Sequence, residues 1–213
     1  IGGGGYVGTV LTDHLLKSGY NVCLFDRLLY DNQTVVPIFL DHPNFVFIHG
    51  DLTNKKDLRN AFKGATDIIL LGGLVGDPIT KSFPKAANKI NDEGYELILA
   101  MLRDLFLGRV IFVSTCSNYG FIEGNSLADE SFSLNPLSLY AEAKVKFERA
   151  ILTQRNDVNY IPIVLRFATA FGLSPRMRFD LTVSEFTRDL YLGKELLVYD
   201  ADTWRPYCHV RDF

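Results

Sequence analysis

Short apolar runs alternate along this chain with longer amphipathic segments, and this alternation is the feature that most restricts its fold. The runs are almost uninterrupted by polar side chains, as is typical of parallel strands that are buried on both faces. The segments between them have the length of helices. The sequence therefore predicts an α/β fold with a doubly wound parallel sheet. The expected strands cover residues 22–25, 45–48, 68–71, 110–113 and 161–167.

Composition excludes several classes of protein. The 213 residues are 47% hydrophobic and 22% charged, which suits one large domain with part of another. A net charge of -3 gives no overall basic field of the kind that binds nucleic acid or anionic membranes. The apolar stretches are too short to span a bilayer, and Cys23, Cys116 and Cys208 have neither disulfide nor metal-ligand spacing. We therefore expect a soluble protein of a reducing compartment, the cytoplasm, without a bound metal.

The helices can be placed from their apolar periodicity. Two long helices are expected over residues 83–107 and 140–154, and a shorter one precedes Gly19, which has the position of a C-terminal cap. The apolar face of that first helix is predicted to consist of Val7, Val10, Leu11 and Leu15.

The chain opens with Ile-Gly-Gly-Gly-Gly-Tyr-Val-Gly, which fits both Gly3, Gly5, Gly8 and Gly2, Gly5, Gly8 as glycine templates. Such a turn lets the backbone approach a pyrophosphate at a helix N-terminus, where free N–H groups favour negative charge. A plain turn is the alternative interpretation. The cofactor-binding residues expected in this turn are Gly2, Gly5, Tyr6, Val7 and Gly8.

Asp26 directly follows the first complete strand, eighteen residues after Gly8. A carboxylate at this point accepts hydrogen bonds from both hydroxyl groups of an adenosine ribose and repels a 2′-phosphate. The neighbouring Arg27 would weaken that discrimination. The alternative is a solvated aspartate that begins a turn. We expect NAD as the cofactor, with Asp26 and Arg27 beside its ribose.

Residues that follow the later strands should meet at the carboxyl edge of the sheet, where open α/β sheets bind their ligands. Asp51 would bind the adenine amino group, or else Gly50-Asp51 is a turn that leads into a helix near Asn54. Small residues after the next strand would let a cofactor lie against the backbone. The cofactor-binding residues expected at this edge are Asp51, Leu52, Leu71, Gly72, Gly73 and Ser114.

Tyr140 and Lys144 are four residues apart and therefore neighbours on one helical face. A nearby cation favours the phenolate, which makes Tyr140 a candidate general acid/base. This spacing alone also arises by chance. Its weight comes from the order of the features: the glycine turn, the ribose aspartate, the hydroxyl-bearing strand end, and then this pair.

Together these residues resemble the extended short-chain dehydrogenase/reductase family, and within it the NAD-dependent nucleotide-sugar epimerase and dehydratase branch. The resemblance covers all 213 residues and implies a Rossmann-type fold. It implies Thr115 as the active-site hydroxyl, Tyr140 as the acid/base and Lys144 as a ligand of the nicotinamide ribose. It also implies that Asn91 supports the cofactor side of the site, and that Arg205 in Trp-Arg-Pro-Tyr holds a substrate diphosphate.

The strand–helix alternation weakens after Gly172, where a loop at residues 174–180 precedes an amphipathic helix over residues 181–192. We expect residues 1–171 to form the NAD-binding domain and residues 172–213 to form part of a substrate region interleaved with its last elements. Only Ile1 precedes the glycine turn, and residues 210–213 resemble the middle of an element. We therefore expect a chain truncated at both ends.

The chain departs from many relatives after the strand at 161–167, where they carry an asparagine that binds the substrate phosphate and this chain has Phe-Ala-Thr. The diphosphate would then depend on Arg176, Arg178 and Arg205, because guanidinium groups form paired hydrogen bonds with phosphate. A solvated loop is the alternative for the first two. Tyr199 would pack against the nucleotide base or belong to the core. The expected substrate-binding residues are Thr115, Cys116, Thr169, Arg176, Arg178, Tyr199 and Arg205.

The resemblance implies that Tyr140 removes a proton from a sugar hydroxyl while hydride passes from the same carbon to NAD. Dehydratases of the family carry Asp-Glu after the active-site hydroxyl, whereas Cys116 and Ser117 stand here. A 4-epimerase acting through a transient 4-keto intermediate needs no such acid and is the preferred hypothesis. A C4 dehydrogenase or 4-keto reductase, and a non-catalytic NAD-binding sensor, are the alternatives. A steroid oxidoreductase would leave Arg205 without a purpose. In relatives the two long helices form a four-helix bundle between two chains, so the resemblance also implies a homodimer.

Overall fold

The computed structural model describes residues 1–124, 126–199 and 201–213. Its longer strands are all parallel and form a two-stranded sheet, β1–β2, and a three-stranded sheet, β3–β4–β5. All five expected strands are present, and β4 is longer than expected at both ends. The strands are β1 (Val22–Asp26), β2 (Phe45–His49), β3 (Ile68–Leu70), β4 (Phe106–Thr115) and β5 (Asn159–Phe167).

Ile1 and Gly2 connect the two sheets. The amino group of Ile1 donates to Ile69 O at 2.8 Å, and Ile1 O accepts from Leu71 N and Gly72 N. On the other side, Gly2 N donates to Phe25 O at 2.8 Å. The two residues therefore take the place of a strand between β1 and β3, which gives the strand order of one open sheet.

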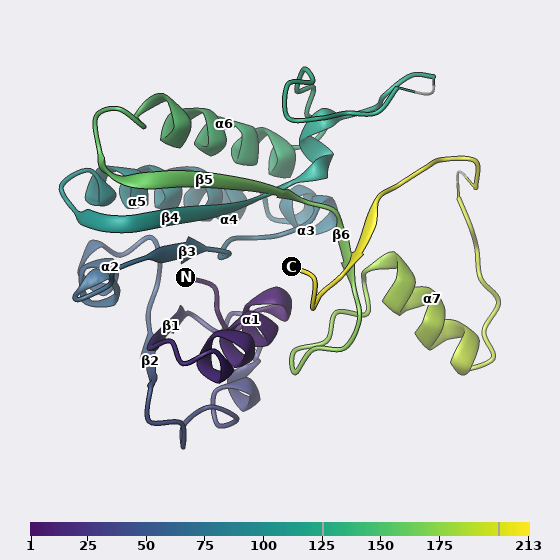
Figure 1. Ribbon diagram of the computed structural model, residues 1–213. Helices are drawn as coiled ribbons and strands as arrows, with labels where there is room; N and C mark the ends of the chain where they lie inside the picture. Colours follow the sequence, from purple (N-terminus) through teal and green to yellow (C-terminus); the bar gives the residue numbers. More distant parts are fainter. Residues whose placement is uncertain (125, 200) are drawn as a thin grey trace.

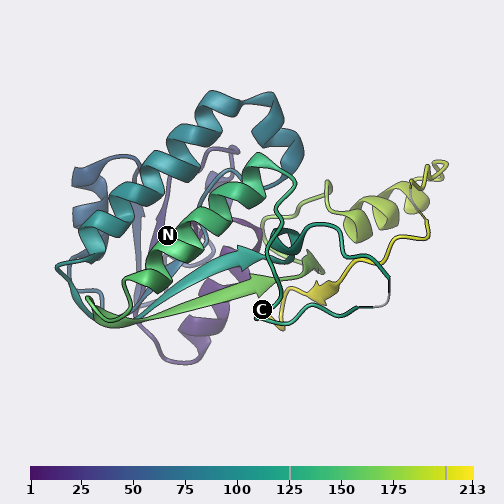
Figure 2. The same ribbon diagram turned by 90° about the horizontal axis from the view of Figure 1, so that it is seen from above.

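Helices cover both faces of this sheet, as a doubly wound fold requires. α1 (Tyr6–Lys17) packs on the side of β1, and α2 (Lys55–Phe62), α5 (Gly94–Leu102) and α6 (Leu139–Thr153) lie on the opposite side (Figure 1). Figure 2 shows α5 and α6 side by side across that face. Asn54 caps α2, because its side chain accepts hydrogen bonds from Lys56 N and Asp57 N. The expected α/β architecture is confirmed.

The predicted helix at residues 83–107 is wrong at its C-terminal end. It consists of α4 (Pro84–Ala87), a π-helical segment (Asn88–Glu93) and α5, which ends at Leu102, and it is preceded by the short α3 (Asp77–Ser82). Residues from Phe106 onward belong to β4, since Phe106 pairs with Asn159. Pairing with the sheet thus overrides the apolar helical periodicity of this segment.

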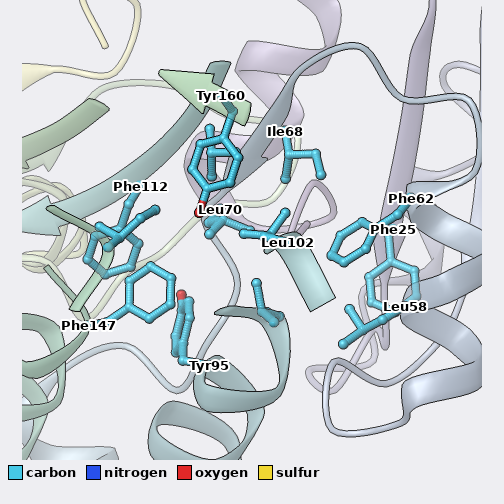
Figure 3. Close-up of a cluster of buried hydrophobic side chains, with 13 residues drawn as sticks. Phe25, Leu58, Phe62, Ile68, Leu70, Tyr95, Leu102, Phe112, Phe147 and Tyr160 are labelled. Carbon is cyan, nitrogen blue, oxygen red and sulfur yellow. The ribbon is translucent and has the colours of Figure 1, made fainter. Parts of the chain in front are cut away.

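The main core lies between the sheet and the helices α2, α5 and α6. Figure 3 shows rings of Tyr95, Phe112 and Phe147 gathered on one side of it, with Phe25 and Phe62 on the other. Tyr95 and Phe112 meet edge to face with centroids 5.5 Å apart, a favourable geometry for aromatic rings. A second cluster around Leu16, Leu24, Val35 and Phe45 fills the space beneath α1 and includes a 3-10 turn at Gln33–Val35.

The predicted apolar face of α1 is half-buried, and the helix approaches its own glycine turn through small residues: a Cβ on Gly8 would lie 2.5 Å from Gly2 O. One expectation about burial is wrong. Strand β5 is not buried on both faces, since Ile161 and Leu165 keep 64% and 38% of their surface exposed. The buried residues of α1 are Tyr6, Gly8, Thr9, Thr12 and Leu16.

The last part of the chain forms a smaller unit beside the sheet. β6 (Thr169–Phe171) pairs in parallel with β7 (Tyr207–His209), and α7 (Thr182–Tyr191) lies between them in the sequence. Phe213 returns to the main domain and stacks on Phe167 with centroids 4.1 Å apart. In the part of the chain that the structure describes, no helix is long and apolar enough to cross a membrane.

Candidate active site

A cavity of about 800 Å³ runs along the carboxyl edge of the sheet. It receives side chains or backbone from the ends of all five long strands, which is where open α/β sheets bind ligands. Most of the residues singled out in the sequence line it. These are Gly2, Gly5, Tyr6, Val7, Gly8, Asp26, Arg27, Asp51, Leu52, Leu71, Gly72, Gly73, Ser114, Thr115, Tyr140, Lys144, Thr169, Arg176, Arg178 and Arg205.

Three of the expected residues are outside that lining. Asn91 is buried behind it, where its side chain accepts from Leu74 N and donates to Leu74 O, both at 2.9 Å. It therefore holds the backbone of the turn after β3, a supporting position. Cys116 is half-buried next to Thr115. Tyr199 is 77% exposed and lies outside any strand, so it contacts neither a core nor this cavity.

The glycine turn and Asp26 form one end of the cavity. Asp26 Oδ2 accepts from Gly4 N at 2.9 Å, and Oδ1 accepts from Leu28 N at 2.7 Å. These two bonds fix the carboxylate against the turn and leave acceptor capacity on each oxygen. Arg27 is turned to Asp51, with 2.7 Å between Arg27 Nη1 and Asp51 Oδ2, so that its charge is paired. That pairing supports the interpretation of Asp26 as a residue that selects a free ribose.

Asp51 serves the turn that precedes α2 as well as the cavity. Its Oδ1 accepts from both Thr53 N and Thr53 Oγ1 at 2.8 Å, which is the geometry of an aspartate-initiated turn. Because Oδ2 is bound by Arg27, a direct bond to an adenine amino group would share an oxygen that is already occupied. The turn interpretation accounts for this residue better than adenine recognition does.

Asn32 belongs to this end of the cavity and was missed in the sequence. Its Nδ2 donates to Gly4 O at 2.6 Å, while Oδ1 is buried and has no hydrogen-bond partner among the described residues. An unpaired buried acceptor is costly, and a hydroxyl donor from a bound ribose would satisfy it. The glycine turn also offers space that side chains would fill. This end of the cavity therefore fits the adenosine part of NAD, although nothing in the sequence pattern marks Asn32.

Lys144 forms the floor of the other end. It is 5% exposed, donates to Val113 O at 2.9 Å, and lies 4.6 Å from the ring centroid of Phe112 and 5.8 Å from that of Tyr140. Burial lowers the pKa of its ammonium from 10.5 to about 7. Tyr95, another residue missed in the sequence, lies beneath Lys144 and donates its hydroxyl hydrogen to Gly72 O. The helix pair of Tyr140 and Lys144 thus faces the same cavity as the glycine turn.

Thr115 ends β4 at this side of the cavity. It caps the 3-10 turn Cys116–Tyr119, because its Oγ1 accepts from Ser117 N at 3.2 Å. Arg205 also lines the cavity, and its positive charge lowers the pKa of the neighbouring Cys116 thiol, which burial raises. The candidate catalytic side chains of Thr115, Tyr140 and Lys144 therefore lie on the same side of the cavity as Arg205, one of the candidate phosphate ligands.

A buried ion pair supports this strand end. Glu148 is 2% exposed and accepts from Arg166 Nε at 3.0 Å and from Ser114 Oγ at 3.1 Å. Asn118 donates to Glu148 and Ser114, and Arg166 donates to the Tyr119 hydroxyl at 2.9 Å. Because Ser114 pairs with Arg166 across β4 and β5, the network ties both strand ends to α6.

The sequence held one signal for this network. Glu148 follows Lys144 by four residues, as Lys144 follows Tyr140, so all three share one stripe of α6. A carboxylate in the buried stripe of a helix indicates a buried partner. That partner, Arg166, is on a strand and could not be identified without the pairing of β4 and β5.

A glycine turn that opens a helix, an acidic residue after the next strand, and a cavity along the carboxyl edge of a parallel sheet define an open α/β dinucleotide-binding domain of the Rossmann type. The model of the NAD dependent epimerase/dehydratase family matches residues 1–213. The chain therefore belongs to the NAD dependent epimerase/dehydratase family. This confirms the resemblance found in the sequence, and NAD as the cofactor of the family.

Individual relatives are more distant. The chain is 26% identical over 175 residues to sterol-4-alpha-carboxylate 3-dehydrogenase, decarboxylating, of Mus musculus, covering 81% of this chain and 45% of that enzyme. UDP-glucose 4-epimerase of Thermus thermophilus, solved with NAD, has a TM-score of 0.84 at 22% identity, over 99% of this chain and 70% of the other. A double mutant of dTDP-glucose 4,6-dehydratase from Streptomyces venezuelae, solved with NAD bound, has a TM-score of 0.86 at 25% identity. The match covers 99% of this chain and 67% of the other. The chain thus spans less than half of the sterol enzyme.

Replacing Asp26 by serine should weaken NAD binding by about 10- to 100-fold and leave NADP binding little changed. The carboxylate supplies charge-assisted hydrogen bonds to the ribose hydroxyls and is also the group that repels a 2′-phosphate. Calorimetric titration with both cofactors measures this. Asp13→Ser, on the solvent side of α1, is the matched control. An equal loss for the two cofactors would mean that Asp26 only shapes the turn.

The buried Lys144 should make folding stability depend on pH. Its folded pKa of about 7 lies below the ordinary 10.5, so between these values the unfolded chain holds a proton that the folded chain has released, and stability rises with pH. Lys144→Met removes this rise. The difference in free energy of unfolding, Lys144→Met minus wild type, should be largest in favour of the variant at and below pH 7. It should decrease as the pH rises toward 10.5.

Urea unfolding at a series of pH values measures the effect, with Lys146→Met on the same helix as the control. Lys146 is exposed, and its hydrogen bond to Glu96 raises rather than lowers its pKa, so its replacement should give a difference that stays constant across most of this window. A constant difference for Lys144→Met would contradict the assignment of a buried, partly deprotonated lysine.

Proposed function

We propose that the protein is an NAD-dependent nucleotide-sugar 4-epimerase that acts through a transient 4-keto intermediate. In this proposal residues 1–171 bind NAD and residues 172–213 begin the substrate region. The observation that supports it best is the convergence of Thr115, Tyr140 and Lys144 on the cavity that also contains the glycine turn and Asp26. A redox cofactor and an acid/base pair at one sheet edge are what alcohol oxidation requires.

The chain's residues divide the proton chemistry among them. Tyr140 takes the proton of the sugar hydroxyl and later returns it, and Thr115 hydrogen-bonds the same oxygen. Lys144, with Nζ 5.8 Å from the Tyr140 ring centroid, stabilises the phenolate and binds the nicotinamide ribose. Bound beside these residues, NAD would supply the hydride acceptor and donor that oxidation and re-reduction of the same carbon require.

The charges around the cavity argue against dehydration, which requires an additional acid/base pair near the sugar. Among the described residues, the carboxylates that line it are Asp26, Asp51 and Asp180. Each of them is engaged: Asp26 with backbone N–H groups, Asp51 with Arg27 and Asp180 with Arg178. The residues after Thr115 are Cys116 and Ser117, neither of which supplies a carboxylate.

A C4 dehydrogenase or a 4-keto reductase is the second candidate, because the same residues support one-way redox chemistry. The similarity to a sterol dehydrogenase extends this alternative to substrates that carry no phosphate. Arg205 at the catalytic end of the cavity favours a phosphorylated substrate, since a guanidinium beside the reacting centre has a natural partner in a diphosphate.

The deciding experiment incubates the purified protein with UDP-, dTDP-, GDP- and CDP-sugars and follows the reduced-nicotinamide absorbance together with product stereochemistry by NMR. We expect a 4-epimer without a stoichiometric change in absorbance, because the cofactor is restored in each cycle. Tyr140→Phe should reduce turnover by at least about 100-fold and retain NAD affinity. Absorbance that rises with a keto product would indicate a dehydrogenase, loss of water a dehydratase, and no reaction with any substrate a sensor.

We also propose a homodimer whose interface is a four-helix bundle formed by α5 and α6 of each chain. The two helices lie side by side on one face of the sheet (Figure 2). Lys146 of α6 joins them, with Nζ 2.8 Å from Glu96 of α5, and it also lies 3.4 Å from Asp92 of the preceding π-helical segment. Light scattering of the purified protein at micromolar concentration should give twice the mass of one chain, and a monomer would overturn the proposal.

A further inference from the structure

Besides Arg27, three arginines line the cavity, and they belong to two different groups. Arg205 is close enough to Cys116, next to Thr115, for its charge to lower the pKa of that thiol, against the larger effect of burial. Arg176 instead lies over the ring of Tyr30, and its loop is bound through Ser174 to Tyr6 and Thr9 at the glycine turn. Arg176 and Arg178 therefore lie at the Asp26 end, while Arg205 lies at the catalytic end. This arrangement does not favour the expectation that Arg176, Arg178 and Arg205 all bind one substrate diphosphate.

The loop that carries Arg176 and Arg178 is fastened to the first turn of α1. Ser174 Oγ donates to Tyr6 O at 2.7 Å and lies 2.9 Å from Thr9 Oγ1. The Tyr6 hydroxyl donates to Gly172 O, and Arg176 N donates to Ser174 Oγ at 3.2 Å. Figure 1 shows this loop, between β6 and α7, beside α1. It is thus attached where the free N–H groups of the helix face the cavity.

Both guanidinium groups are held in fixed positions. Arg176 lies over the ring of Tyr30, with 4.7 Å between the guanidinium carbon and the ring centroid. Arg178 is 18% exposed at its side chain and donates from Nε to Asp180 Oδ1 at 3.1 Å. Its Nη2 is 3.7 Å from the position that a Cβ would take on Gly76. Two cations are therefore oriented on the same cavity as the glycine turn, one of them packed on an aromatic ring instead of a carboxylate.

Arg178 is paired with Asp180, whereas among the described residues Arg176 has no carboxylate within ion-pair distance and packs on Tyr30. Burial and the positive charge of Arg178 both lower the pKa of Arg176. Asp26, the nearest carboxylate of the turn, already accepts two backbone N–H groups. A ligand group with two negative charges, lying between the α1 N-terminus and the loop, would receive hydrogen bonds from both sides.

We propose that Arg176 and Arg178 bind the pyrophosphate of the dinucleotide cofactor and that the loop at residues 172–180 clamps the cofactor from the side opposite the glycine turn. The proposal rests on NAD binding by this cavity and not on the identity of the sugar. It gives the loop two tasks, because its backbone follows β6 into the substrate region while its side chains retain the cofactor. Arg205 then remains for the substrate.

The test measures binding alone, by calorimetric titration of the purified protein with NAD, ADP, adenosine and NADP. Arg176→Gln and Arg178→Gln should each reduce affinity for NAD and ADP by at least about tenfold and leave adenosine binding within about twofold, since adenosine has no phosphate. Arg205→Gln is the matched control and should leave NAD affinity unchanged. Asp180→Asn keeps Arg178 but removes its carboxylate partner, and should not weaken ADP binding.

Two outcomes would overturn the clamp. If Arg176→Gln and Arg178→Gln retain wild-type affinity for NAD and ADP but lose affinity for uridine diphosphate, the arginines serve the substrate. If they lose affinity for NADP alone, they contact a 2′-phosphate. Arg176→Lys separates charge from geometry, because it keeps the cation and loses the planar fork, and it should recover only part of the ADP affinity. Failure of the epimerase proposal would leave all of these measurements unaffected.

Discussion

The contact between Gly2 and the backbone at Leu71 and Gly72 is the constraint on which the rest of the molecule depends. Gly2 has φ of +80°, and a Cβ there would lie 2.3 Å from Gly72 N. Because the turn can approach this closely, Ile1 pairs with the end of β3 and Gly2 with the end of β1, and the two sheets become one. The same approach brings the N-terminus of α1 to the carboxyl edge, where Asp26 and Asn32 secure the turn at Gly4.

Helix α6 carries both the proposed chemistry and the support for it. Tyr140, Lys144 and Glu148 share one stripe, so the helix that carries the proposed acid/base also buries a carboxylate beneath the end of β4. A buried ion pair adds little net stability after desolvation, but removing one partner leaves a costly unpaired charge. The pair of Glu148 and Arg166 therefore fixes the relative positions of α6, β4 and β5 more than it stabilises the fold. Thr115 and Tyr140, on different elements, are held in register through it.

The cavity has two chemically distinct ends. One holds Asp26, Asn32 and the glycine turn, with backbone donors and a carboxylate suited to a ribose and its phosphates. The other holds buried Lys144 and the Thr115 strand end, with Arg205 near Cys116. The loop after β6 belongs to the first end through its bonds to Tyr6 and Thr9, although the chain continues from it into the substrate region. The proposed cofactor clamp and the proposed substrate region are thereby linked in one segment.

The sequence by itself determined that the sheet is parallel and doubly wound. It also determined the positions of the glycine turn, of Asp26 after a strand, and of Tyr140 and Lys144 on one helix. These depend on local periodicity and fixed spacing, which the chain carries without reference to distant residues. Tertiary structure decided the end of the helix at Leu102, the exposed face of β5, and the division of the arginines between the two ends of the cavity. It also revealed Asn32, Tyr95 and Arg166. Each of these depends on which segments contact one another in the folded chain. Burial, strand pairing and the charges near a side chain are set by tertiary contacts and not by the local sequence pattern.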